Sequence, residues 1–300
     1  MWHLYKTSIL YSIFSTLLFG VILYLLNKIF YGKHIWDPFT VEAGLDVWFC
    51  EFTDMKRFIR QPINTFTNFW YANNAIYFFQ KAMSDKRRTQ PYNLITANPF
   101  YSFLLSGICF YTFICSTFFH STLAEVASDL DFSAVYSACL FPLMYFTHRL
   151  WMMLIGVRPG EKHRKSMTFL IIAFTIIYLI LTFLVPFDHT HEIVLVMILL
   201  TGIFGFVVER REVVKTNKWY LYSTMFFITI AMVFFKLDTA KILCNPHSLI
   251  QPHSVWHLMN GIAVLYLYLY IRSENYENSM HQRLLPLREK YLQFKSDSYN

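Results

Sequence analysis

The sequence predicts an all-α membrane protein, a bundle of seven transmembrane helices with one extra transmembrane helix in front of it. Hydrophobic residues make up 55% of the 300 residues and aromatic residues 19%, and the mean hydropathy is +0.36. Soluble domains are seldom so apolar, whereas proteins with several membrane spans usually are. Apolar runs of roughly 20 residues, the length that crosses a bilayer, recur along the whole chain.

Eight such runs are expected to be membrane spans, and each is expected to be helical because an open strand would leave backbone groups unpaired in lipid. The expected spans are residues 8–30, 64–82, 99–121, 130–153, 167–186, 191–208, 218–235 and 252–271.

The first run could be a signal peptide, because Met1–Lys6 is followed directly by an apolar run. It is long, however, and no small-residue cleavage site follows it, so we expect residues 8–30 to remain as an extra helix.

We expect one integral membrane domain over the whole chain, residues 1–300. An outer segment at 32–63 would precede the seven-helix core at 64–272, and a cytosolic tail would follow at 273–300.

Basic residues fall in alternate loops and so predict the orientation in the membrane. The loops at 86–88, 158–165 and 210–218 contain Lys and Arg, whereas those at 122–129 and 187–190 contain neither. By the positive-inside rule both termini are predicted to be cytosolic. The net charge of +7 then follows from topology and from attraction to anionic lipid, and nothing indicates binding to nucleic acid.

Three histidines are expected to meet at the outer ends of these spans. His120 closes one span, and His253 and His257 lie four residues apart at the start of the last, on one helix face. Three imidazoles with an open fourth position are the ligand set of a catalytic zinc, although ligand type alone also permits iron or copper. For His253 and His257 alone, an alternative is that both histidines only hydrogen-bond to neighbouring helices. That alternative does not explain why a third histidine, His120, is expected at the same depth.

Asp131 and Ser116 add an acid and a hydroxyl at the same outer side. Zinc lowers the pKa of bound water to about 7 and polarises a carbonyl, so we expect Asp131 to act as general base and then to protonate the leaving group. Ser116, one turn before His120, would stabilise an oxyanion or orient the water. Taken alone, Asp131 also fits a helix-start carboxylate and Ser116 a small packing residue.

Ser116-x-x-x-His120, Asp131 and His253-Ser-Val-Trp-His257 together resemble the alkaline ceramidases. These belong to a seven-helix hydrolase superfamily that also includes adiponectin receptors and GPI-remodelling hydrolases. The resemblance implies that the three histidines bind zinc and that Asp131 and Ser116 are catalytic. It also implies hydrolysis of a lipid amide, above all ceramide to a sphingoid base and a fatty acid; no protein partner is indicated.

The resemblance runs from about residue 46 to residue 272 and implies a calcium site in the outer segment, because Asp46-Val-Trp-Phe-Cys-Glu51 is similar to the family's Asp-Trp-Cys-Glu motif with two extra residues. The expected oxygen donors are Asp46, Trp48 through its carbonyl, Glu51, Asp54 and Gln61. The family has an asparagine where this chain has Thr53 or Asp54, and a glutamate at Gln61, so the lost charge is expected to weaken calcium binding. The alternative is a solvated acidic loop.

Cys50 and Cys244 are the only cysteines in expected outer segments, on an oxidising side of the membrane. The family pattern has cysteines at both matching places, which implies a disulfide that would pin 32–63 over the mouth of the site. The alternative is two unpaired thiols.

Other functions stay open at the level of sequence. A hydrolase of the same superfamily would act on an ester or another N-acyl lipid, and a receptor on the same scaffold would not be catalytic. A di-iron desaturase needs several histidine boxes, usually on the cytosolic face, whereas this chain has one, at the outer side. The expected location is an endoplasmic reticulum or Golgi membrane, or a bacterial inner membrane.

Overall fold

The computed structural model describes residues 2–40, 49–87, 93–155, 164–185, 189–211 and 216–274. In these residues the regular elements are helices, apart from one isolated β-bridge, so the predicted all-α class is confirmed. The helices are α1 (Trp2–Ile29), α2 (Pro62–Thr67), α3 (Phe69–Lys86), α4 (Leu94–Ala97), α5 (Phe100–Thr122), α6 (Glu125–Leu154), α7 (Arg164–Leu184), α8 (Thr190–Arg211), α9 (Lys218–Thr239) and α10 (Pro252–Arg272). A short 3₁₀ helix, Asp37–Phe39, follows α1.

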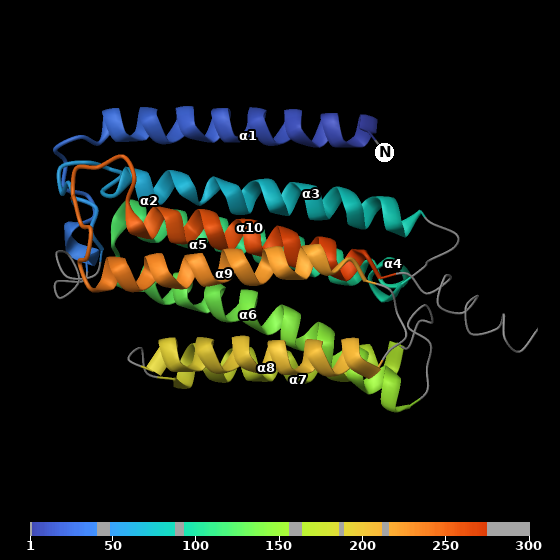
Figure 1. Cartoon of the computed structure of the whole chain (residues 1–300). Coiled ribbons are helices and arrows are strands. Elements are labelled where there is room, and N and C mark those ends of the chain that lie inside the picture. Colours follow the sequence, from blue (N-terminus) through green and yellow to red (C-terminus); the bar gives the residue numbers. More distant parts are fainter. Residues whose placement is uncertain are drawn as a thin grey trace, which may run out of the picture.

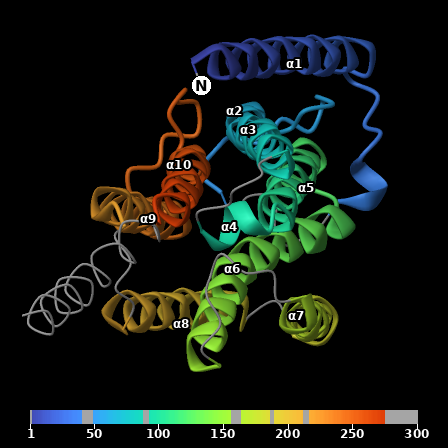
Figure 2. The same cartoon turned by 90° about the vertical axis from the view of Figure 1, so that its right-hand side faces the viewer.

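Six of these helices, α5 to α10, are long and apolar enough to cross a membrane, and α1 adds a shorter apolar stretch at Ile13–Ile29. The chain is therefore a multi-pass membrane protein. The long helices all run along the bundle (Figure 1), with α1 and α8 inclined to α7 (Figure 2). Seen along the bundle, α3, α5 and α10 lie between α1 on one edge and α6 to α8 on the other, with α9 beside α10 (Figure 2).

The span expected at 64–82 is divided between α2 and α3, which meet at Asn68. Helix α3 is not among the six apolar spans, because it includes the charged residues Lys81, Asp85 and Lys86. Its buried carboxylate is paired within the bundle, since Asp85 contacts Arg272 at the end of α10. Polar residues inside a membrane bundle need such partners.

The turn between α5 and α6 is much shorter than the loop expected at 122–129. Leu123 has a left-handed backbone (φ 53°) and its N–H bonds to the Phe119 carbonyl at 2.6 Å, which ends α5. Ala124 pairs with Thr40 in the isolated bridge, and α6 begins at the next residue, Glu125. Asp131 consequently lies in the second turn of α6 and not at its start, as the expected span 130–153 would have it.

Helices α3 and α10 approach each other closely at Gly261. A Cβ built on Gly261 would lie 2.1 Å from Cδ1 of Trp70, so no larger residue fits without a shift of the indole. The Asn74 side chain donates a hydrogen bond to the Gly261 carbonyl at 2.7 Å across the same contact. Gly261 lies one turn after His257, so this contact also fixes the depth of the histidine-bearing turn.

We predict that Gly261→Ala destabilises the protein by about 1–3 kcal/mol, the usual cost of forcing extra volume into a packed interior. The measurement is thermal unfolding in detergent. Gly107→Ala on α5 is the matched control, because nothing lies within 4 Å of a Cβ at that position. Equal melting temperatures for the two variants would contradict the prediction.

Candidate metal centre

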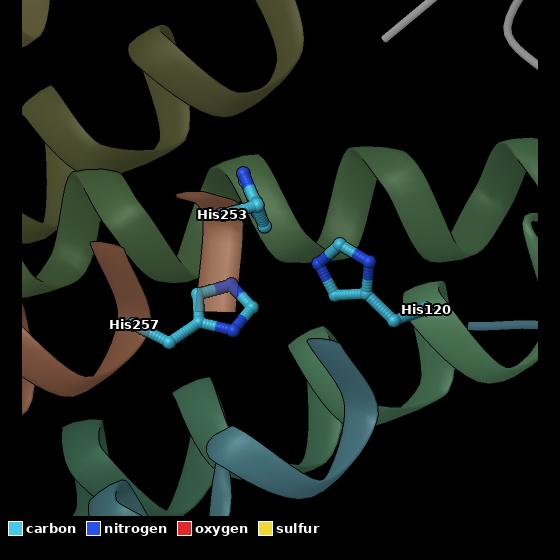
Figure 3. Close-up of side chains that lie close together, drawn as sticks. All are labelled: His120, His253 and His257. Carbon is cyan, nitrogen blue, oxygen red and sulfur yellow. The ribbon is translucent and has the colours of Figure 1, made fainter. Parts of the chain in front are cut away.

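Three histidine side chains from two helices face one another at one end of the bundle (Figure 3). His120 comes from the last turn of α5, and His253 and His257 from the first turns of α10. All three are buried, and their candidate ligand nitrogens lie within 4.8 Å of one another. Ring centroids are 4.9 Å apart for His120–His253, 5.0 Å for His120–His257 and 4.6 Å for His253–His257. Among the described residues no other group of His, Cys, Asp or Glu side chains meets the same condition.

The start of α10 is well defined, and this start sets where His253 and His257 lie along the helix. Pro252 occupies the first helical position, and Gln251 and Ser254 form a capping box around it. His253 and His257 lie four residues apart on the face that meets α5.

The Nδ1 atoms of two histidines are held by oxygen acceptors. Nδ1 of His120 lies 2.8 Å from Oε1 of Gln61. Nδ1 of His257 lies 3.2 Å from the carbonyl oxygen of Asn64 and 3.1 Å from the Thr67 hydroxyl. An amide or carbonyl oxygen only accepts, so each Nδ1 carries the hydrogen and each Nε2 keeps its lone pair.

The third histidine faces a carboxylate. Nδ1 of His253 lies 3.5 Å from Oδ2 of Asp238, a residue at the end of α9 that is fully buried. Carboxylate partners on the outer nitrogen are typical of metal-binding histidines, because they orient the ring and raise its basicity.

The donor set fits a metal ion. Nε2 of His120 is buried and has no hydrogen-bond partner among the described residues, a state that costs free energy unless a ligand satisfies the atom. Three imidazoles suit zinc, and also iron or copper. The cluster is thus able to hold a metal cofactor.

Ser116 and Asp131 form a second part of the site. Ser116 is buried on α5, one turn or about 6 Å before His120. Its hydroxyl is hydrogen-bonded to the carboxylate of Asp131 on α6. Asp131 is half-buried and lies on α6, next to α5, the helix that carries His120. It does not belong to the group of side chains whose ligand atoms lie within 4.8 Å of one another, so it is not a fourth member of the histidine cluster.

A family model for ceramidases matches residues 45–292, most of the chain. The chain belongs to the ceramidase family. The resemblance seen in the sequence is therefore confirmed, and the family implies a hydrolase that acts on a lipid in the membrane. No curated protein matches the sequence.

In this ceramidase-family chain the three expected calcium donors that the structure describes are engaged with other groups. Glu51 is buried and accepts backbone N–H groups of Ile63 at 2.7 Å and Asn64 at 2.8 Å, which caps the start of α2. Burial raises the pKa of Glu51 to about 7, against the opposing effect of these two hydrogen bonds. Asp54 pairs with Arg57 at 2.9 Å, and Gln61 contacts His120 as described.

Asp46 and Trp48, the other two expected calcium donors, lie outside the described residues. The calcium site therefore stays a prediction. In the structure Gln61 contacts the His120 ring directly, and Glu51 accepts from the N–H of Asn64, whose carbonyl contacts His257.

Two residues of the site escaped the sequence reasoning. Asp238 is the partner of His253, and its signal in the sequence was an aspartate near the end of an otherwise apolar run, where a charge is costly. Phe49 covers the cluster, with its ring centroid 4.1 Å from that of His253 and 5.0 Å from that of His120. No pattern in the sequence singled out Phe49.

Cys50 and Cys244 are joined by a disulfide in the structure, and Cys109, Cys115 and Cys139 are free. The bond links the loop that carries Phe49 to the connection between α9 and α10. The Cys50 N–H donates to Asp238 at 3.0 Å, so the disulfide adjoins the partner of His253. The loop that carries Phe49 is thereby tied over the three histidines.

We predict that replacing both Cys50 and Cys244 with serine lowers stability by about 2–4 kcal/mol, because the bond closes a very long loop. The check is thermal unfolding with and without reductant. Reductant should lower the melting temperature of the wild type and of the control Cys139→Ser, but should leave that of the double variant unchanged. A wild type that reductant does not affect would contradict the prediction.

Proposed function

We propose that this protein is a zinc-dependent ceramidase, which hydrolyses the amide bond of a ceramide-like lipid to a sphingoid base and a fatty acid. The single observation that carries the proposal is the buried cluster of His120, His253 and His257, in a chain of the ceramidase family. Their Nδ1 atoms face protein oxygens, which leaves Nε2 of each ring to hold the metal.

Zinc held by these nitrogens would polarise the amide carbonyl and lower the pKa of a water molecule. Asp131 would accept a proton from the attacking water and later deliver it to the nitrogen of the leaving amine. The hydrogen bond from Ser116 holds the Asp131 carboxylate toward α5, where His120 lies one turn away. Ser116 would thus orient the base, or turn its hydroxyl toward the developing oxyanion.

The hydrocarbon chains of the lipid would lie between α3, α5, α6 and α10. A small apolar cavity of about 20 Å³ marks incomplete packing there, with Tyr71, Cys109, Ala138 and Pro142 among its walls. Pro142 has no N–H to offer the carbonyl of residue 138, which weakens α6 at the cavity. We expect the side chains here to move apart when lipid binds, since an acyl chain needs far more room.

We propose that the histidine end of the bundle faces the outer or luminal side, with both termini in the cytosol. The distribution of Lys and Arg supports this orientation. The start of α1 and the end of α10 both lie at the end of the bundle away from the histidines, as this orientation requires (Figure 1).

The first test is release of fatty acid by the purified protein from ceramides and from matched ester lipids, with bound metal quantified. We predict about one zinc per chain and cleavage of ceramide, and loss of both in His257→Ala, because two imidazoles are too few for a catalytic zinc. Zinc binding with cleavage of esters alone would keep the chemistry and change the substrate class. A protein with no zinc and no cleavage would overturn the proposal and leave the receptor as the alternative.

Asp131→Asn is predicted to keep the metal and to lose activity by at least about a hundredfold, the lower range of general acid–base contributions. The amide cannot accept the proton of the attacking water. Asp129→Asn is the matched control, two residues earlier on α6 and exposed. Full activity of Asp131→Asn at normal zinc content would remove Asp131 from the mechanism.

A further inference from the structure

We propose that residues 30–40, the segment that follows α1, act as a brace that positions the metal ligand His120 through Arg60 and Gln61. The segment precedes residues 45–292, the part of the chain that matches the family model. That His120 binds zinc rests on the proposed function; the contacts of the brace do not.

The end of α5 is the point at which the brace acts. The last carbonyl groups of a helix have no partner within the helix. Here the Gln61 N–H donates to the His120 carbonyl at 3.1 Å, and the Arg60 N–H donates to the Ser121 carbonyl at 3.1 Å. The Arg60 side chain donates to the Thr122 carbonyl at 2.9 Å. Residues 60 and 61 therefore cap three consecutive carbonyls, and Gln61 also accepts from the His120 ring.

Arg60 is fully buried, and residues of the brace are what pair with its charge. Its Nη2 contacts Oδ1 of Asp37, and its Nη1 donates to the Thr40 hydroxyl. Burial lowers the pKa of Arg60, and the charge of Asp37 opposes that effect. A buried charge that loses its partner is strongly destabilising, so the position of Arg60 depends on Asp37 and Thr40.

The brace is itself held firmly to the loop before α2. The Gly32 N–H, at a left-handed backbone position (φ 71°), donates to the Lys56 carbonyl at 2.7 Å. The Trp36 indole donates to the Phe58 carbonyl at 3.0 Å, and its ring packs on the Phe58 ring with centroids 5.2 Å apart. Fixed contacts at both ends make the segment a support of defined geometry.

The far end of the brace reaches the helix that carries the proposed base. Thr40 pairs with Ala124 in the isolated bridge, directly before α6 begins at Glu125. The brace thus touches the end of α5 and the start of α6, the two helices that supply Ser116, His120 and Asp131. A segment that served only to connect a membrane anchor would need neither contact.

The test compares Asp37→Ala with His34→Ala in the full-length protein. His34 contacts the other carboxylate oxygen of Asp37, Oδ2, at 3.0 Å, but it is exposed, and the described contacts of Arg60 do not include His34. Two quantities are measured: the zinc affinity against a competing chelator, and hydrogen exchange of the Arg60 and Gln61 amides in zinc-free protein. These two amides are the donors to α5, so their exchange reports the cap directly.

We expect Asp37→Ala to weaken zinc binding about tenfold, the lower range for loss of a group that supports a ligand, and to speed exchange of both amides. His34→Ala should change neither quantity, and Asp37→Glu should restore part of both. Thr40→Val, which removes the hydroxyl acceptor of Arg60, is the second variant if Asp37→Ala does not fold.

Unchanged zinc affinity together with unchanged exchange in Asp37→Ala and Thr40→Val would overturn the brace. Equal effects of His34→Ala and Asp37→Ala would also overturn it, because they would show general loosening of the segment. Should the wild type bind no zinc, the proposed function would fail, while the amide exchange would still decide whether Asp37 holds the cap on α5.

Discussion

The structure depends on how the polar end of α5 is satisfied where little water is available. His120, Ser121 and Thr122 leave three carbonyl groups and an imidazole that need partners at this point. Arg60 and Gln61 supply the partners of the three carbonyls and of Nδ1 of the imidazole, and each is itself held by a second group: Asp37 for Arg60, and Thr53 for the Gln61 amide. The loop before α2, the segment after α1 and the α5–α6 turn therefore converge on one helix end.

The charge around the cluster suits a cation. The Nδ1 atoms of His120 and His257 donate to protein oxygens, and Nδ1 of His253 lies 3.5 Å from the buried carboxylate of Asp238. A buried anion is costly unless charges and hydrogen bonds offset it, and the partners of the Asp238 carboxylate among the described residues include the His253 ring and the Cys50 N–H. A divalent ion bound by the ring of His253 would offset part of that cost, so Asp238 and the metal would stabilise each other through the ring. The disulfide then matters for function as well as stability, since the Cys50 N–H fixes the orientation of Asp238.

Sequence reasoning located the residues with strong local patterns and missed those placed by tertiary contacts. The His-x-x-x-His spacing, the position of His120 at a span end and the carboxylate of Asp131 all follow from helix periodicity, which a sequence displays directly. Asp238 and Phe49 reach the histidines only because α9 and the outer loop fold back over them. The spacing of residues along the sequence does not indicate such a tertiary contact.

Two helices also differed from expectation, α6 in where it begins and α3 in how polar it is. Helix α6 begins earlier than its apolar run, because the left-handed turn at Leu123 allows an immediate restart of the helix. Helix α3 was expected to be an ordinary apolar span, but its charged residues exceed what a lipid-facing helix tolerates. Hydropathy measures composition, whereas the partners that satisfy Asp85 and Asn74 are provided by α10.

The polarity of α3 explains why an extra helix packs where α1 does. Among the described side chains of α1 many are apolar and exposed, as suits a helix that faces lipid. Its inner face meets α3 and α5, where Phe19 packs against Phe69 and Phe113 with ring centroids 5.5 Å and 5.3 Å apart. Helix α1 thereby covers part of the least apolar long helix of the bundle, and Asn27 near its end accepts the Ile59 N–H at 3.3 Å, one residue before Arg60. Helix α1 thus covers α3 at Phe69 and contacts the residue before Arg60 at its end, close to the three histidines.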